Sequence, residues 1–207
     1  MIHKLIVCLL SVALVTPILG QTKVDTSGGT KKSQRIKQKK EHRMVVVIVT
    51  TLGTIEAELY EKDAPNTAAN FAGLANEGYY NGIIFHRVVP GFVIQGGDST
   101  GTGRGGKSIY GGEFADELKP ETNSYKEGYK KGVLAMANRG PNTNTSQFFI
   151  LLADQAGMPK NYTIFGKVIK GIDVVEKIGK VELVPPGARD GKPKVPVVMN
   201  KVSVTTE

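Results

Sequence analysis

The sequence predicts a mainly β protein whose folded part is an antiparallel barrel or sandwich. A β-branched run at residues 44–50 is followed by alternating apolar and polar residues at 53–59, and further short apolar segments follow, separated by glycine, proline and asparagine. Short strands at this spacing are typical of antiparallel β folds, and only two segments show a helical pattern. The 207 residues suffice for one well-buried domain with terminal appendages.

The predicted domain covers residues 44–207 and opens with a β-hairpin. Its first strand, MVVVIVT at 44–50, is rich in β-branched residues, and its second, GTIEAEL at 53–59, has the period of two that indicates one buried face. Leu52 and Gly53 are expected to form the turn between them.

A helix is expected after this hairpin. Asp63 supplies an acidic residue before the first turn, Pro65 fits that turn because its missing N–H is not needed there, and Gly78 ends the helix. The apolar face is predicted to consist of Ala68, Phe71, Leu74 and Ala75.

The rest of the domain alternates short apolar segments with turns. A short helix is expected at 172–178, with Val174, Val175 and Ile178 facing inward, and a closing strand at 196–204. The strands expected before this helix lie at 83–85, 92–95, 133–137, 148–152 and 163–168.

An apolar segment stands at the start of the chain. Residues 1–20 contain Lys4, an apolar run from Leu5 to Val15 and a small residue, Gly20, which is the layout of a secretory signal peptide. If the segment is not cleaved, it would instead anchor the chain, although its apolar run is short for a membrane span of about 20 residues. We therefore expect an exported protein, periplasmic or secreted, or one anchored in a membrane through this segment.

Residues 21–43 are predicted to be a basic flexible linker. Lys and Arg outnumber Asp and Glu by 27 to 19 over the whole chain, and much of this excess lies in the linker, which has almost no apolar residues to form a core. The folded domain is therefore nearly neutral, which argues against a nucleic-acid interface on it. The linker is interpreted as a solvated spacer or, alternatively, as a weak contact to a membrane surface or an acidic partner.

Cysteine and histidine usage limits the chemistry. The one cysteine, Cys8, lies in the first apolar run, so a chain without that segment has no disulfide, thiolate metal site or thiol nucleophile. His86 is the only histidine after residue 43, which excludes a histidine metal cluster. No metal and no cofactor are expected.

A glycine-rich segment from Gly101 to Ser108, GTGRGGKS, matches the phosphate-binding pattern GxxxxGK[ST]. In a phosphate loop, a helix begins at the end of this pattern and contributes its N-terminus to the site. Gly111 and Gly112 follow closely, and two glycines disfavour such a helix by roughly 2 kcal/mol relative to alanine. The segment is therefore predicted to be a loop that binds no nucleotide.

A set of further motifs is highly specific in combination. They are FHR at 85–87, FVIQGGD at 92–98, MAN at 136–138, SQFF at 146–149 and YTIFG at 162–166. Together these motifs resemble the cyclophilin family, and the resemblance runs from about residue 46 to 204. It implies a closed eight-stranded antiparallel β-barrel with two flanking helices, and peptidyl-prolyl cis–trans isomerase activity on proline-containing polypeptides.

The resemblance also implies a site. Arg87 would be the principal catalytic residue, because its planar guanidinium would approach the prolyl nitrogen as amide resonance is lost. Gln95, also counted among the catalytic residues, would hold the peptide backbone while the bond turns, and His86 is either a third catalytic residue or a structural one. The substrate-binding residues would be Phe92, Val93, Ala137, Asn138, Gln147, Phe149, Met158 and Tyr162.

Departures from the family pattern concern specificity. Many members carry a tryptophan that contacts cyclosporin where this chain has Gly157, and Tyr162 stands in the place of a common histidine, so cyclosporin is expected to bind weakly. Arg104 and Arg139 replace small residues in loops that flank the neighbouring side-chain pocket. These two arginines predict a preference for acidic residues upstream of the proline.

The predicted function is catalysis of Xaa-Pro rotation by a monomer, in support of protein folding outside the cytoplasm. The alternative is a non-catalytic module that binds proline peptides on the same fold. Recognition needs only the pocket, whereas turnover also needs the arginine, so the presence of Arg87 favours the enzyme.

Overall fold

The computed structural model describes residues 43–207, so the predicted segments at 1–20 and 21–43 lie outside it except for Arg43 and stay predictions. The helices of the described part are α1 (Pro65–Asn76), α2 (Asn123–Glu127) and α3 (Ile172–Ile178). Its strands are β1 (Met44–Thr50), β2 (Gly53–Leu59), β3 (Arg87–Val89), β4 (Val93–Gly96), β5 (Val133–Met136), β6 (Phe148–Leu151), β7 (Ile164–Lys170), β8 (Leu183–Val184), β9 (Lys192–Pro193) and β10 (Met199–Thr206).

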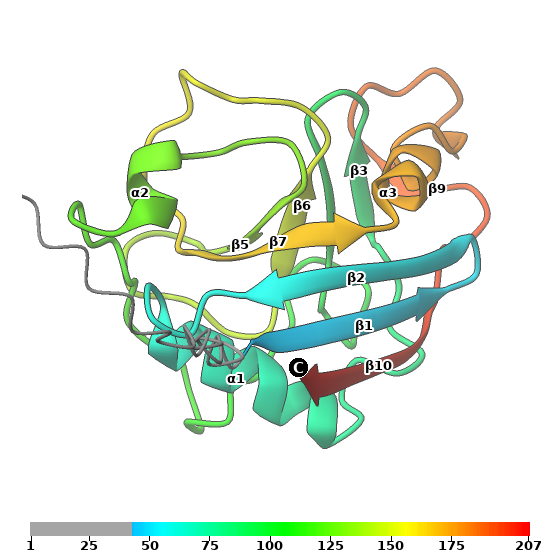
Figure 1. Ribbon diagram of the computed structural model, residues 1–207. Coiled ribbons are helices and arrows are strands. Elements are labelled where there is room, and N and C mark those ends of the chain that lie inside the picture. The colour runs from blue at the N-terminus through cyan, green and yellow to red at the C-terminus, as the bar shows by residue number, and fades with distance from the viewer. Residues whose placement is uncertain (1–42) are drawn as a thin grey trace, which may run out of the picture. The chain divides into compact units, whose positions relative to one another are not determined.

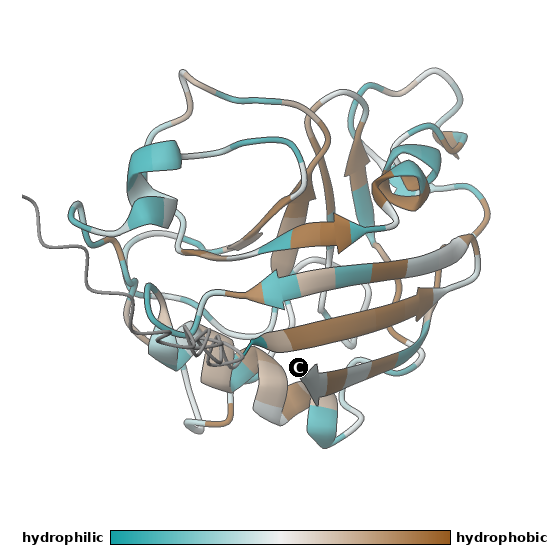
Figure 2. Ribbon diagram, in the orientation of Figure 1, coloured by the Kyte–Doolittle hydropathy of each residue, from teal (hydrophilic) through white to brown (hydrophobic). Residues whose placement is uncertain are grey.

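Eight of these strands form one curved antiparallel sheet in the order β10-β1-β2-β7-β5-β6-β4-β3, while β8 and β9 form a separate two-stranded sheet (Figure 1). The mainly β, eight-stranded architecture is thus confirmed. The predicted hairpin is also confirmed, because β1 pairs with β2 from Val45 opposite Glu58 to Thr50 opposite Gly53. β1 is almost continuously apolar whereas β2 alternates (Figure 2). Both strands lie inside the sheet, because β10 pairs with the other edge of β1 and β7 with the other edge of β2.

The closure of the barrel is looser than expected. Among the described residues, the edge strands β3 and β10 share no ladder, and one bridge, between Ile84 and Val198, joins the chain just before each of them. The free edge of β3 is taken instead by Gly191, whose backbone exchanges two hydrogen bonds with Val88, at 2.8 and 3.1 Å. The strand expected at 83–85 is accordingly reduced to that single bridge.

α1 begins without a local side-chain cap. Ala64 occupies the N-cap position, and Asp63, expected to serve the first turn, accepts a hydrogen bond from a backbone N–H of α2 at 2.9 Å instead. The carboxylate of Glu117 accepts the hydrogen bonds of Asn66 N at 3.1 Å and Thr67 N at 2.8 Å. A distant anion therefore satisfies the free N–H groups and the positive end of this helix.

α2 is a helix that the sequence interpretation missed, since only two helices were expected. The side-chain oxygen of Thr122 accepts a hydrogen bond from Tyr125 N, and Gly128 ends the helix with a positive φ of 71°. Both are ordinary cap signals. The five-residue length hides the helical period that would have revealed them.

The sheet separates two apolar clusters. Successive residues of a strand point to opposite faces, so Ile94 of β4 and Ile150 of β6 lie in the main core with Phe71 of α1. Val93 and Phe149 on the same strands face the other way and form the smaller cluster with residues of β5 and β7. That smaller cluster carries the site.

Candidate active site

A pocket of about 190 Å3 lies over the smaller cluster. A larger cavity of about 640 Å3 contains none of the predicted site residues, so side-chain chemistry and not size selects the site. The pocket is lined by Arg87, Phe92, Val93, Gln95, Ala137, Asn138, Phe149, Met158 and Tyr162. Every one of these residues belongs to the set predicted from the sequence.

Strand register brings the centre of the pocket together. Arg87 of β3 pairs with Gln95 of β4, Gln95 pairs with Phe149 of β6, and Phe149 pairs with Ala135 of β5. Paired residues on neighbouring strands project from the same face. Arg87, Gln95 and Phe149 therefore form one row across the sheet, although 62 positions separate the first from the last in the numbering.

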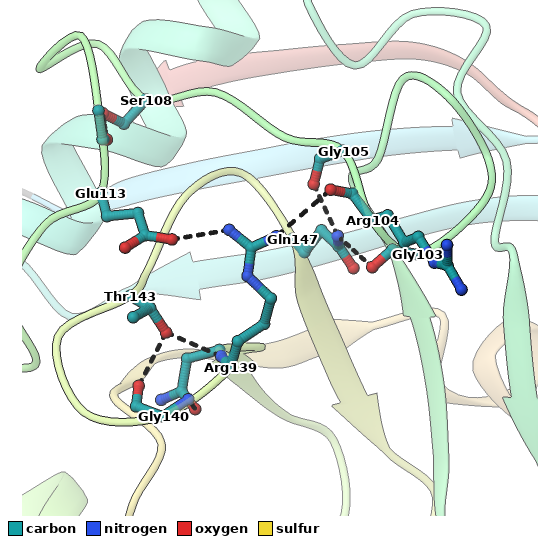
Figure 3. Close-up of polar contacts among 11 residues, drawn as sticks. Gly103, Arg104, Gly105, Ser108, Glu113, Arg139, Gly140, Thr143 and Gln147 are labelled. Carbon is teal, nitrogen blue, oxygen red and sulfur yellow. Dashed lines mark hydrogen bonds and ion pairs between the residues drawn. The ribbon is translucent and has the colours of Figure 1, made fainter.

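A chain of hydrogen bonds fixes the polar end of this row. Gln147 donates through Nε2 to the carbonyl oxygens of Gly103 and Gly105, at 3.0 and 2.8 Å (Figure 3). Because carbonyls only accept, the amide orientation of Gln147 is determined, and its Oε1 accepts from Gln95 Nε2 at 3.1 Å. Gln95 Oε1 in turn accepts from Arg87 Nη1 at 3.2 Å.

The other side of the Arg87 guanidinium is bound by a residue that was not predicted. Asp190 accepts from Arg87 Nε at 2.9 Å through one oxygen and from Nη2 at 2.7 Å through the other. This bond raises the pKa of Arg87 and lowers that of Asp190. The two residues are 103 positions apart, and no motif links them in the sequence.

The glycine-rich segment that imitates a phosphate loop already holds an anion, which is Asp98. Its buried carboxylate accepts hydrogen bonds from the backbone N–H groups of Thr100, Thr102 and Gly103, at 2.8, 3.1 and 2.7 Å. No helix begins at Ser108, since the next helix along the chain, α2, starts only at Asn123. The segment is a loop, as expected, and it presents to Gln147 the two carbonyls that begin the hydrogen-bond chain.

Ring contacts and hydrogen bonds fix the residues of the apolar wall of the pocket. Phe149 and Tyr162 meet edge to face, with ring centroids 5.5 Å apart. Tyr129 fixes the backbone of Tyr162 twice, because its hydroxyl donates to Tyr162 O at 2.9 Å and accepts from Tyr162 N at 3.0 Å. Asn138 is also tied down, donating through Nδ2 to Asn161 O at 2.9 Å.

Four predicted residues lie outside the pocket lining, and one of them, Gln147, contacts Gln95 instead. His86 is buried beside Arg87 but does not line the pocket, its ring nitrogens have no hydrogen-bond partner among the described residues, and burial lowers its pKa. The guanidinium of Arg139 is engaged by Glu113, at 2.7 Å, and also contacts the carbonyl oxygen of Arg104. The Arg104 side chain is exposed and points away from the Arg139–Glu113 ion pair (Figure 3).

Comparisons with known proteins agree with this geometry. Residues 45–204 match the family described as cyclophilin type peptidyl-prolyl cis-trans isomerase/CLD. The peptidyl-prolyl cis-trans isomerase ppi1 of Schizosaccharomyces pombe is 53% identical over 136 residues, which cover 66% of this chain and 85% of the relative. The human peptidyl-prolyl cis-trans isomerase-like 1 is 53% identical over 137 residues, which cover 66% of this chain and 80% of that protein.

Solved structures show the same fold. The crystal structure of a cyclophilin type peptidyl-prolyl cis-trans isomerase from Cryptosporidium parvum has a TM-score of 0.72 and 37% identity, covering 80% of this chain and 99% of that one. A second structure of the Cryptosporidium protein, in the presence of the dipeptide Ala-Pro, has a TM-score of 0.71.

The relatives correct the predicted location of the protein. The expectation of an exported, periplasmic or secreted protein is contradicted by the matches to isomerase-like 1 proteins of Neurospora crassa, mouse and human and to ppi1 of Schizosaccharomyces pombe. That expectation depended only on the apolar run within residues 1–20, which lies outside the described residues. The match to the family covers residues 45–204, which belong to the folded domain. Within residues 43–207, no helix is both long and apolar enough to span a membrane.

Proposed function

Because the chain belongs to the cyclophilin family and is a peptidyl-prolyl cis–trans isomerase, we propose that Arg87 is its principal catalytic residue and that the adjoining pocket holds the proline ring. The observation that carries this proposal is the row of Arg87, Gln95 and Phe149 on one face of three adjacent strands, at the wall of the pocket. A proline ring has no N–H to satisfy, so aromatic and aliphatic walls suit it.

The chemistry asked of Arg87 is modest. Rotation about an Xaa-Pro bond breaks no covalent bond, and its barrier of about 18–20 kcal/mol comes from amide resonance. As the bond twists, the lone pair returns to the prolyl nitrogen, so an N–H donor aimed at that nitrogen stabilises the transition state more than the ground state. An acceleration from about ten seconds to about one millisecond needs roughly 5.4 kcal/mol of such stabilisation.

The residues around Arg87 orient its guanidinium or contact the substrate. Asp190 and Gln95 take three of the five N–H donors of the guanidinium, which leaves one on Nη1 and one on Nη2 for a substrate. Gln147 orients Gln95 from behind. We propose that Asn138 and Ala137 contact the peptide backbone, and we assign His86 no catalytic step because it does not line the pocket.

Arginine substitution tests the proposal. In a refolding assay limited by proline isomerisation, Arg87→Ala is expected to lose about 100-fold in kcat/KM, the scale of removing one aligned donor from a transition state. Arg87→Lys keeps the charge without the planar fork and should recover only part of the loss. Equal acceleration by wild type and Arg87→Ala would exclude Arg87 as the catalytic group.

Substrate choice is the second part of the proposal. We infer that Arg104 favours an acidic residue upstream of the proline, because its side chain is exposed next to Gln147. Arg104 contacts Arg139 through its backbone carbonyl, so this contact does not engage its guanidinium. Arg139 contributes less, since Glu113 already neutralises it.

A peptide library with acidic and neutral residues upstream of proline measures this preference. Wild type should favour the acidic peptides, and Arg104→Ala should lose most of that bias. Lys201→Ala on β10 removes the same charge away from the pocket lining and should keep the bias. A library without acidic preference contradicts the proposal.

Further partner proposals rest on single features. We propose that cyclosporin binds weakly, because Gly157 offers no side chain at the edge of the pocket next to Met158; inhibition in the same refolding assay measures this. The monomeric state and the contact of residues 21–43 with an acidic partner or surface stay predictions.

A further inference from the structure

We propose that Asp190 is a positioning residue for Arg87, in addition to the pocket residues that the family resemblance implies. The inference rests on the catalytic role proposed for Arg87. Its basis is the two-point contact in which Asp190 Oδ1 and Oδ2 lie 2.9 and 2.7 Å from Arg87 Nε and Nη2. Two parallel bonds of this kind fix the plane of a guanidinium as well as its position.

The backbone brings Asp190 to this place. Gly191 forms an antiparallel bridge with Val88, the residue after Arg87, through hydrogen bonds in both directions. In such a bridge, the residues on either side of the paired positions lie diagonally across from each other, so Asp190 is the diagonal neighbour of Arg87 on the same face. The contact therefore follows from register and not from a chance approach of two surface side chains.

The loop that carries Asp190 is itself constrained. A Cβ atom added at Gly191 would lie 2.9 Å from the carbonyl oxygen of Val184, so only glycine allows β9 to approach β8 this closely. Lys194 N also donates to Glu182 O at 2.8 Å beside the β8–β9 pair. Asp190 is thus presented by a closed hairpin.

Arg87 needs such a restraint. Its side chain is 42% exposed, and an arginine at the wall of an open pocket has several rotamers of similar energy. Gln95 provides one hydrogen bond, to Nη1, which leaves the guanidinium free to turn about it. With Asp190 bound to Nε and Nη2, the two remaining N–H groups are held in a fixed direction before a substrate arrives.

A double-mutant cycle with kcat/KM as its readout tests the proposal. Asp190→Ala is expected to lower kcat/KM about tenfold, mainly through kcat, because a loosened donor is misplaced in the transition state. Asp190→Asn keeps one accepting oxygen and should lose less than Asp190→Ala. Asp173→Ala, which removes an exposed acid paired with Lys177 on α3, is the matched control and should leave kcat/KM unchanged.

The arginine variant separates positioning from a structural role. In an Arg87→Ala background, Asp190→Ala should cause no further loss, since nothing is left to position. Unchanged or increased kcat/KM in Asp190→Ala alone, or an equal loss in both backgrounds, would overturn the inference. An Arg87→Ala variant as active as wild type would instead refute the proposed role of Arg87 itself.

Discussion

At the scale of single residues, hydrogen bonds around the site offset the loss of hydration of its buried polar atoms. Asp98 is the clearest case, because the residue is 1% exposed and its carboxylate lies within a loop whose N–H groups point at it. Burial raises its pKa, but hydrogen bonds from Thr100 and from the backbone of Gly105 and Gly103 outweigh this and lower the pKa to about 2. The ionised form of Asp98 therefore stabilises the fold.

The sign of this effect sets a pH window. A carboxyl with a pKa lower in the folded than in the unfolded chain, where it is about 3.9, contributes stability above that value and loses it as pH falls toward 2. We expect Asp98→Asn to be less stable than wild type at pH 7 by about 2 kcal/mol. Between pH 5 and pH 3, this difference should narrow by about 1 kcal/mol.

Urea unfolding of wild type and Asp98→Asn at several pH values measures the difference. Because all other carboxyl groups are common to both proteins, their titration cancels. A difference that stays constant between pH 5 and pH 3 contradicts the role assigned to Asp98.

The residues of the pocket wall could be predicted, whereas residues that bind a partner far away in the sequence, such as Asp190 and Glu117, could not. Arg87, Gln95 and Phe149 lie in dense local motifs, which are specific enough to carry a family resemblance. Asp190 and Glu117 act on residues 103 and 50 positions away, through contacts that only the folded register creates. No local pattern in a sequence encodes such pairs.

At the scale of elements, α1 depends on an anion from outside its own sequence. Glu117 accepts hydrogen bonds from Asn66 N, Thr67 N and the Thr67 hydroxyl, at 3.1, 2.8 and 2.8 Å. Glu117→Ala leaves these groups without their partner and should lower the free energy of unfolding by about 1–2 kcal/mol, the usual range for loss of a helix cap.

The exposed Glu121 offers a matched control for this change. Glu121→Ala should change the free energy of unfolding by less than about 0.5 kcal/mol, since it caps no helix. Urea unfolding of both variants decides the matter, and equal stabilities would contradict the capping role of Glu117.

Strands and helices were predicted where one physical pattern dominates. β2 has a clear period of two, α3 has a helical period and β1 is a continuous β-branched run, and all three lie where expected. The expected strand at 83–85 became a single bridge, because Gly191 occupies the edge that a longer pairing would need. Competition for a sheet edge is decided by tertiary contacts and is invisible in a local pattern.

At the scale of the whole molecule, the excess of Lys and Arg over Asp and Glu and the isomerase site lie in different segments of the chain. All pocket-lining residues lie between Arg87 and Tyr162, whereas the basic segment lies at 21–43. Removal of residues 1–41, which retains Arg43 and its ion pair with Glu207, should therefore leave kcat/KM within about twofold of the full chain.

The same refolding assay compares the two proteins directly. A loss of tenfold or more in the shortened chain, with its thermal unfolding unchanged, would contradict the assignment of the whole site to the folded domain.

The central claim is that Arg87 drives rotation of a bound Xaa-Pro bond, and exchange NMR on a proline peptide tests it most directly. With catalytic amounts of wild type, cross-peaks between the cis and trans signals of the peptide should appear within a mixing time far shorter than the uncatalysed exchange. With Arg87→Ala, the peptide signals should still broaden on binding, but the cross-peaks should vanish. Cross-peaks of equal intensity with both proteins would contradict the claim.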